Sequence, residues 1–142
     1  MRFPLKRIAV ALAGTVLYGC ANDSASFLID GREHAVTLLR LQPYFWNKKT
    51  ELDLIVARFP DCQRRHKLKP AMDGDIRAEL FETGPGAFVL KRGSEWYVME
   101  TTSCGLQEAA APTQTGARPV GVFDASSGRL KFVIAATTAS PR

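Results

Sequence analysis

Apolar and polar residues alternate along several short stretches of the chain. Leu52, Leu54 and Val56 fall on one face of one such stretch, and Tyr97 and Met99 fall on one face of another. A period of two residues is typical of a β-strand with one buried face, because successive side chains of a strand point to opposite sides of the sheet. Both stretches are therefore predicted to be strands.

Short apolar or β-branched segments between Gly and Pro turn residues complete the pattern. The segments predicted as strands are 27–29, 35–41, 52–57, 76–82, 87–90, 95–100, 120–123 and 130–134. The polar stretch 63–75 is predicted to be a loop or a short helical turn, and the Ala-, Thr- and Pro-rich stretch 108–119 is predicted to be a loop. About eight short strands predict an all-β fold, a small antiparallel β-sandwich or open barrel.

The first twenty residues combine three basic side chains with an apolar run and contain no acidic residue. Arg2, Lys6 and Arg7 precede Ile8–Tyr18, a run of eleven residues. A helix of that length covers about 16 Å, whereas the hydrocarbon core of a bilayer is about 30 Å thick. The run is too short to cross a membrane, and the order of basic, apolar and small residues predicts a cleaved signal helix.

Four residues at the end of this segment carry a resemblance to a known class: Leu17, Tyr18, Gly19 and Cys20. They resemble the lipobox of bacterial lipoproteins. The resemblance implies that signal peptidase II removes residues 1–19 and that Cys20 carries diacylglycerol and an acylated amine, a combination that anchors a protein stably to a bilayer. Ala21 implies, by the sorting pattern of the class, the inner leaflet of the outer membrane, with the body facing the periplasm. Cleavage after Ala21 by signal peptidase I is the alternative.

The predicted strands and the lipobox-like segment together divide the chain into four parts. It consists of a lipoprotein signal peptide at 1–19, a lipidated tether at 20–26, a single β-rich domain at 27–134 and a flexible tail at 135–142.

Much of the positive charge belongs to the signal peptide. The whole chain has 19 basic and 14 acidic residues, and residues 1–19 hold three of the basic ones, so the mature chain has a net charge of +2. So small an excess argues against nucleic-acid binding. Four basic residues nevertheless lie close together: Arg64, Arg65, Lys67 and Lys69. This cluster is either a surface for anionic head groups or lipopolysaccharide phosphates, or an ordinary solvated loop.

Two cysteines remain once Cys20 is assigned to lipid. Cys62 and Cys104 form an even pair in an exported chain, where disulfides form and persist, so a disulfide is predicted. The alternative is a metal-binding module, because Cys62 and His66 are spaced to share an ion that Cys104 and His34 would complete as a tetrahedral set.

The three consecutive aromatic residues Tyr44, Phe45 and Trp46 form a candidate interaction surface. Successive strand positions face opposite ways, so three neighbours cannot all enter one core. An exposed aromatic side chain favours contact with a partner, a glycan or a membrane interface, whereas packing beneath a loop is the alternative. The segments 43–46 and 61–66 also loosely resemble small proteobacterial lipoproteins, a resemblance that implies no activity.

No phosphate loop, nucleophile elbow or paired-histidine metal helix occurs in the sequence. We therefore expect a non-enzymatic, lipid-anchored envelope protein with no cofactor beyond its covalent lipid, which binds an envelope protein, a glycan or lipopolysaccharide. A periplasmic hydrolase that uses carboxylates is one alternative, and the metal-binding module through Cys62, His66 and Cys104 is the other.

Overall fold

In the computed structural model, every regular element among the described residues is a β-strand, which confirms the all-β prediction. The structure describes residues 22–43, 46, 48–72, 76–110 and 116–136, and the expected signal helix and Cys20 lie outside them. Within those residues no helix is long and apolar enough to cross a membrane. The strands are β1 (Asp23–Asp30), β2 (His34–Leu41), β3 (Lys49–Arg58), β4 (Cys62–Lys67), β5 (Ala71–Met72), β6 (Arg77–Gly84), β7 (Ala87–Arg92), β8 (Glu95–Glu100), β9 (Gly105–Ala109), β10 (Arg118–Asp124) and β11 (Lys131–Ile134).

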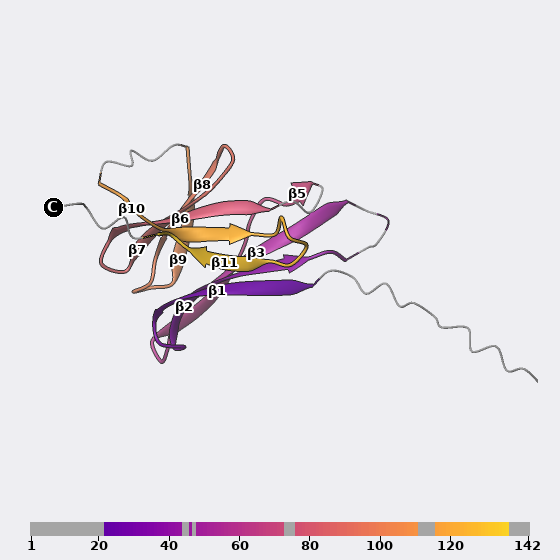
Figure 1. Cartoon of the computed structure of the whole chain (residues 1–142). Helices are drawn as coiled ribbons and strands as arrows, with labels where there is room; N and C mark the ends of the chain where they lie inside the picture. The colour runs from indigo at the N-terminus through magenta and orange to yellow at the C-terminus, as the bar shows by residue number, and fades with distance from the viewer. Residues whose placement is uncertain (1–21, 44–45, 47, 73–75, 111–115, 137–142) are drawn as a thin grey trace, which may run out of the picture.

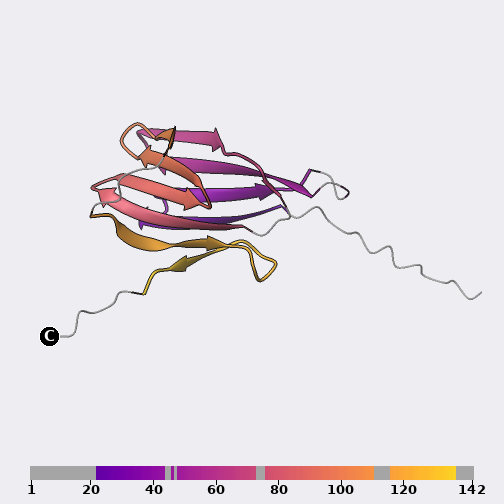
Figure 2. The ribbon, with the colours of Figure 1, turned by 90° about the horizontal axis from the view of Figure 1, so that it is seen from above.

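The strands form two antiparallel sheets that pack face to face (Figure 1). The first sheet has the order β1-β2-β3-β4, with the short β5 paired to β3, and the second has the order β11-β10-β6-β7-β8-β9. Seen from above, β11 lies along one side of the molecule and β4 along the opposite side (Figure 2). The sheets do not close into a barrel, so of the two expected architectures the sandwich is the one formed.

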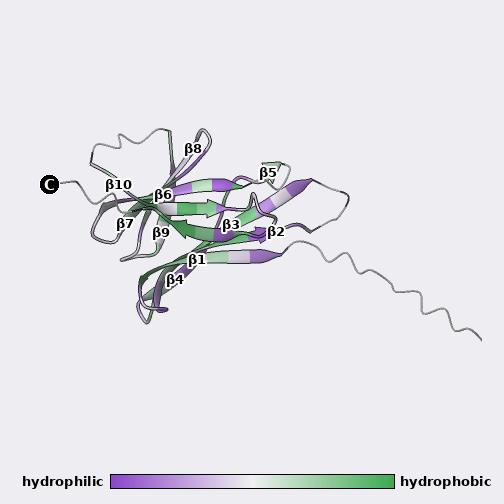
Figure 3. Ribbon diagram, in the orientation of Figure 1, coloured by the Kyte–Doolittle hydropathy of each residue, from purple (hydrophilic) through white to green (hydrophobic). Residues whose placement is uncertain are grey.

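Side chains from both sheets form one core. Leu52, Leu54 and Val56 of β3 are fully buried, as their alternation predicts. Tyr97 and Met99 of β8 face the core from the second sheet. The strands are hydrophobic where they meet in the middle of the molecule (Figure 3). Burial of these side chains is the main favourable contribution to folding, at about 25 cal/mol per Å² of apolar surface.

Three sequence expectations were wrong in their boundaries. Residues 23–26, expected in the tether, belong to β1 and pair with β2. The stretch 63–75, expected as a loop, contains most of β4 and all of β5, and the expected loop 108–119 contains the end of β9 and the start of β10. These segments are at sheet edges or strand ends, where little apolar surface is buried and no clear alternation is required.

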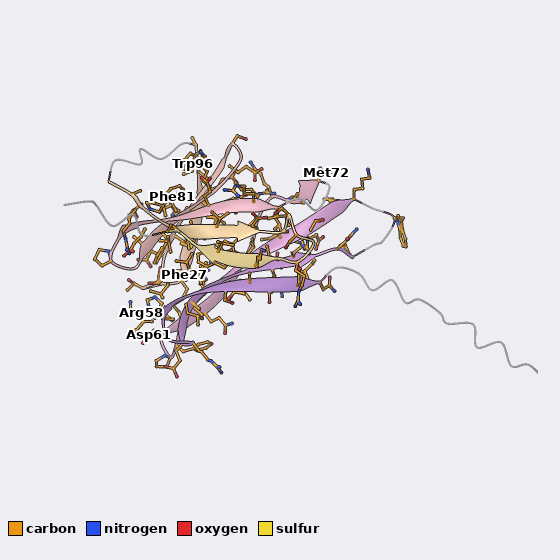
Figure 4. The ribbon with its side chains drawn as sticks, in the orientation of Figure 1. Phe27, Arg58, Asp61, Met72, Phe81 and Trp96 are labelled. Atoms are coloured by element: carbon orange, nitrogen blue, oxygen red, sulfur yellow. A yellow bond between two sulfur atoms is a disulfide. The ribbon has the colours of Figure 1, made fainter. Side chains whose placement is uncertain are left out.

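The strand ends and turns gather at two opposite ends of the sandwich. The start of β1, the end of β2 and the start of β3 lie together at one end, which we name the Asp23 end. Met72 of β5 pairs with Lys49 at the same end. The opposite end, named the Asp61 end, holds the β1–β2 and β3–β4 turns, which are joined by the bond from Phe59 N–H to the Glu33 carbonyl. Figure 4 shows Met72 and Asp61 at these opposite ends.

A partly buried ion pair ties the two sheets together at the Asp23 end. Arg40 of β2 donates from Nε to Asp23 Oδ1 at 2.7 Å and from Nη2 to Asp23 Oδ2 at 2.6 Å. Arg40 Nη2 also donates to the Gly128 carbonyl at 2.9 Å, and the Leu130 N–H donates to Asp23 Oδ2 at 2.8 Å. The first residue of β1 is thus bound to the β10–β11 turn of the other sheet.

Candidate functional site

A disulfide joins the sheets along the side of the sandwich where β4 and β9 lie, which we name the disulfide edge. Cys62 begins β4, and Cys104 lies between β8 and β9. Their sulfurs are bonded, with the Cα atoms 6.0 Å apart and 42 positions between the residues, as the sequence predicts. Cys104 is fully buried and has a positive φ of 56°. The bond therefore fixes β4 of one sheet against the β8–β9 turn of the other.

His66 reinforces the same edge. Its Nε2 lies 2.7 Å from the backbone oxygen of Cys104. The metal-binding set considered from the sequence needs two thiolates, and here the two sulfurs are bonded to each other. Within the described part of the chain, no three His, Cys, Asp or Glu side chains gather in an arrangement that could hold a metal ion. The tetrahedral set of Cys62, His66, Cys104 and His34 is therefore not assembled.

The basic cluster predicted as a loop is instead an exposed edge strand and its continuation. Arg64, Arg65 and Lys67 lie on β4 and are exposed, and Lys69 follows after the buried Leu68. Arg64, Arg65 and Lys67 thus follow one sheet edge, with Arg64 on one face of β4 and Arg65 and Lys67 on the other. A strand rich in basic residues also prevents unwanted pairing at a free sheet edge, so this cluster has a structural role whether or not it binds a ligand.

Two members of the cluster are already paired within the protein. Arg65 Nε donates to Asp53 Oδ2 at 2.6 Å. Lys69 Nζ lies 2.5 Å from Glu108 Oε1 of β9, and this hydrogen bond raises the pKa of Lys69 above its usual value. Among the described residues, Arg64 and Lys67 form no ion pair, so they are the members best placed to meet an anion.

Asp53 is an acidic residue whose burial the sequence did not predict. It lies on the outer face of the first sheet, opposite Lys67 across the β3–β4 ladder, and only 8% of its side chain is exposed. Arg65 satisfies its Oδ2, whereas its Oδ1 has no hydrogen-bond partner among the residues that the structure describes. The only signal in the sequence was an acid inside an otherwise apolar strand.

The aromatic candidates are only partly described. Tyr44 and Phe45 lie outside the described residues, whereas Trp46, between β2 and β3, is 69% exposed. Trp46 belongs to the Asp23 end, and the basic residues of β4 run along the disulfide edge. The two surfaces expected from the sequence are therefore separate surfaces.

The surface pockets are shallow. One of about 390 Å³ is lined by Phe27, Val120 and Ile134 among others, and one of about 380 Å³ is lined by the segments 70–72 and 92–95. A third, of about 240 Å³, is lined by Arg77, Glu79, Lys91 and Gly93. None of these three pockets is lined by two carboxylates.

Three acidic residues that a hydrolase of this kind could use contact arginines. Asp53 pairs with Arg65, Glu82 pairs with Arg118, and Asp61 lies 3.8 Å from Arg58. Figure 4 shows Arg58 and Asp61 together at the Asp61 end. These three acids are thus distributed over separate ion pairs.

The fold and its linked edge define a small, disulfide-bridged β-sandwich of two antiparallel sheets. Comparison with protein-family models, with curated proteins and with solved structures finds no match.

Proposed function

We propose that this chain is a lipid-anchored lipoprotein of the bacterial envelope whose β-sandwich is a non-enzymatic binding or structural module facing the periplasm. The lipid is attached at Cys20, after removal of residues 1–19. The proposal takes its membrane address from the lipobox-like residues 17–20 and its role from the shape of the folded body.

The observation that carries the proposal is the position where folding begins. β1 starts at Asp23, only three positions after Cys20. A basic and apolar segment at 1–19 thus leads almost directly into a folded domain, as a segment removed at Cys20 requires. The disulfide between Cys62 and Cys104 supports the same compartment, because such bonds form and persist after export and are rare in the cytosol.

Two exposed features support a binding role over a catalytic one. Arg64 and Lys67 present positive charge on the free edge of β4. The three shallow pockets described above bring no pair of carboxylates together. A protein of this kind contacts its partner over an open surface, and an envelope component with anionic groups suits the β4 edge.

Intact mass spectrometry of the protein extracted from membranes tests the anchor. We expect the mass of residues 20–142 plus one diacylglyceryl group and one acyl chain, less two hydrogens for the disulfide. Cys20→Ser should remove the lipid and release the protein from the membrane fraction. An unmodified mass, or a Cys20→Ser variant that sediments with membranes like the parent, contradicts the proposal.

Ala21→Asp is the matched control for this experiment. By the sorting pattern of the lipoprotein class, it should keep the lipid and the membrane association but retain the protein in the inner membrane. Separation of inner and outer membranes on a density gradient measures the change. An identical distribution of both forms contradicts the outer-membrane assignment while leaving the anchor intact.

A further inference from the structure

We propose that the Asp23 end of the sandwich docks onto the phospholipid surface that holds the anchor, with Trp46 and Met72 entering the head-group region. The inference rests on the proposed lipidation of Cys20. It adds a defined orientation and a second, non-covalent membrane contact made by the folded domain.

The first step is the length of chain between the lipid and the fold. Three residue steps separate Cys20 from Asp23, and an extended chain covers at most about 10 Å in three steps. β1 then runs for eight residues toward the Asp61 end, about 26 Å away at 3.3 Å per residue. A lipid on Cys20 therefore holds the Asp23 end close to the head groups and keeps the Asp61 end away from them.

The second step is what lies beside the entry of the tether. Asp23 pairs in register with Arg40, and Asn22 Oδ1 accepts a hydrogen bond of 3.3 Å from the Gln42 N–H. The tether thus enters the domain next to the start of the β2–β3 connection, which carries Trp46. Figure 1 shows the start of β1 at the same end of the molecule as the end of β2, the start of β3 and β5.

The third step is the chemistry of that end. Trp46 is 69% exposed and Met72 is 67% exposed, a large apolar contribution for a surface in water. Tryptophan is favoured at membrane interfaces because its ring is apolar and its N–H is polar. Lys48 and Lys49 are exposed beside Trp46 and suit anionic head groups, each worth about 1 kcal/mol near such a surface.

The net charge indicates whether the lysines or the apolar side chains contribute more to the membrane contact. Asp73 and Asp75 follow Met72 in the sequence and offset the two lysines in net charge. We therefore assign the contact mainly to apolar insertion of Trp46 and Met72. This assignment predicts that docking persists on vesicles of zwitterionic phosphatidylcholine and is only modestly weakened by salt.

The chain offers matched fluorescent probes, because Trp46 and Trp96 are its two tryptophans. Trp96 lies on β8, with the Lys91 ammonium 5.1 Å from its ring, and Figure 4 shows it well separated from Met72. Trp96→Phe leaves Trp46 as the reporter, and Trp46→Phe leaves Trp96. Both lipidated variants are purified from membranes and reconstituted into phosphatidylcholine vesicles with or without brominated acyl chains.

In vesicles without bromine, we expect the Trp46 emission to be shifted to the blue relative to the unlipidated Cys20→Ser form in detergent-free buffer. Brominated lipid should then remove most of the Trp46 emission and leave the Trp96 emission nearly unchanged. Equal quenching of the two probes, or no quenching of Trp46, overturns the inference. The acylated mass of each variant is measured first. A protein that proves to carry no lipid refutes the proposed anchor, whereas an acylated protein with unquenched Trp46 refutes only the docking.

Discussion

Loss of the Cys62–Cys104 bond is expected to be the most damaging small change to the folded domain. The perturbation is the double substitution Cys62→Ala/Cys104→Ala. Closing a loop of 42 residues restricts the unfolded chain by about 4 kcal/mol in the entropic description. Domains of this size have about 5–15 kcal/mol of stability in total, so this loss is a large fraction.

Other contacts along the disulfide edge do not replace the bond. The His66–Cys104 hydrogen bond contributes about 1 kcal/mol, and the Lys69–Glu108 pair is half exposed on both sides and contributes little. β4 still pairs with β3 in the variant, so we expect a folded but weaker domain. Cys104 is fully buried, and its replacement by Ala also removes packing around the lost sulfur.

Urea denaturation followed by circular dichroism measures the effect. With a slope of about 2 kcal/mol per molar urea, a loss of about 4 kcal/mol lowers the midpoint by about 2 M. Parent protein unfolded in reducing agent is the control, because it loses the cross-link but keeps both sulfurs. A midpoint within about 0.3 M of the oxidised parent, at unchanged slope, would refute the reasoning.

Two further substitutions test the packing and the electrostatics. Burial raises the pKa of Asp23, but hydrogen bonds from Arg40 and the Leu130 N–H, with the charge of Arg40, outweigh it and hold the pKa below 3.8. The stabilisation by ionised Asp23 is therefore present above about pH 4 and is lost as the pH falls through the lower pKa of the folded state. Asp23→Asn should lower the free energy of unfolding by about 3 kcal/mol at pH 7 and by less at pH 3, as measured by urea titrations at the two pH values. An equal loss at both pH values would contradict this electrostatic role. Gly121→Ala places a Cβ 2.4 Å from the Val133 carbonyl oxygen and from the Phe132 ring, so it should destabilise the domain by about 3 kcal/mol. Gly84→Ala is the control, because open space surrounds Gly84 and the melting temperature should change little. An equally small change in both variants would show that β11 can move aside.

The parts of the fold that the sequence predicts are those that bury one face against the core. β3 and β8 were predicted because their apolar residues alternate, and the structure buries the expected ones, Leu52, Leu54 and Val56 on β3. The disulfide was predictable because only two cysteines remain after the lipobox. The lipid anchor itself is still a prediction from residues 17–20.

The edge strands could not be predicted from periodicity. Residues 63–67 of β4 are polar at every position because this edge strand is largely exposed to solvent. β9 shows no alternation of apolar residues. The pairing of Asp23 with Arg40 was equally hidden, because it joins two strands whose register is fixed only by the complete sheet. The burial of Asp53 could not be predicted either, because its partner Arg65 lies on β4, a strand that the sequence did not predict.

The charged edge of β4 has a consequence for a protein confined to a bilayer. The proposed lipid anchor would restrict neighbouring copies to one plane, where their local concentration would far exceed that in solution. Among the strands that the structure describes, β4 has β3 as its one neighbour in the sheet, and an unprotected strand at that position would invite the same strand of a second copy to extend the sheet. Like charges on Arg64 and Lys67 would repel such a copy, so we expect the anchored protein to remain unaggregated when it is crowded in the membrane.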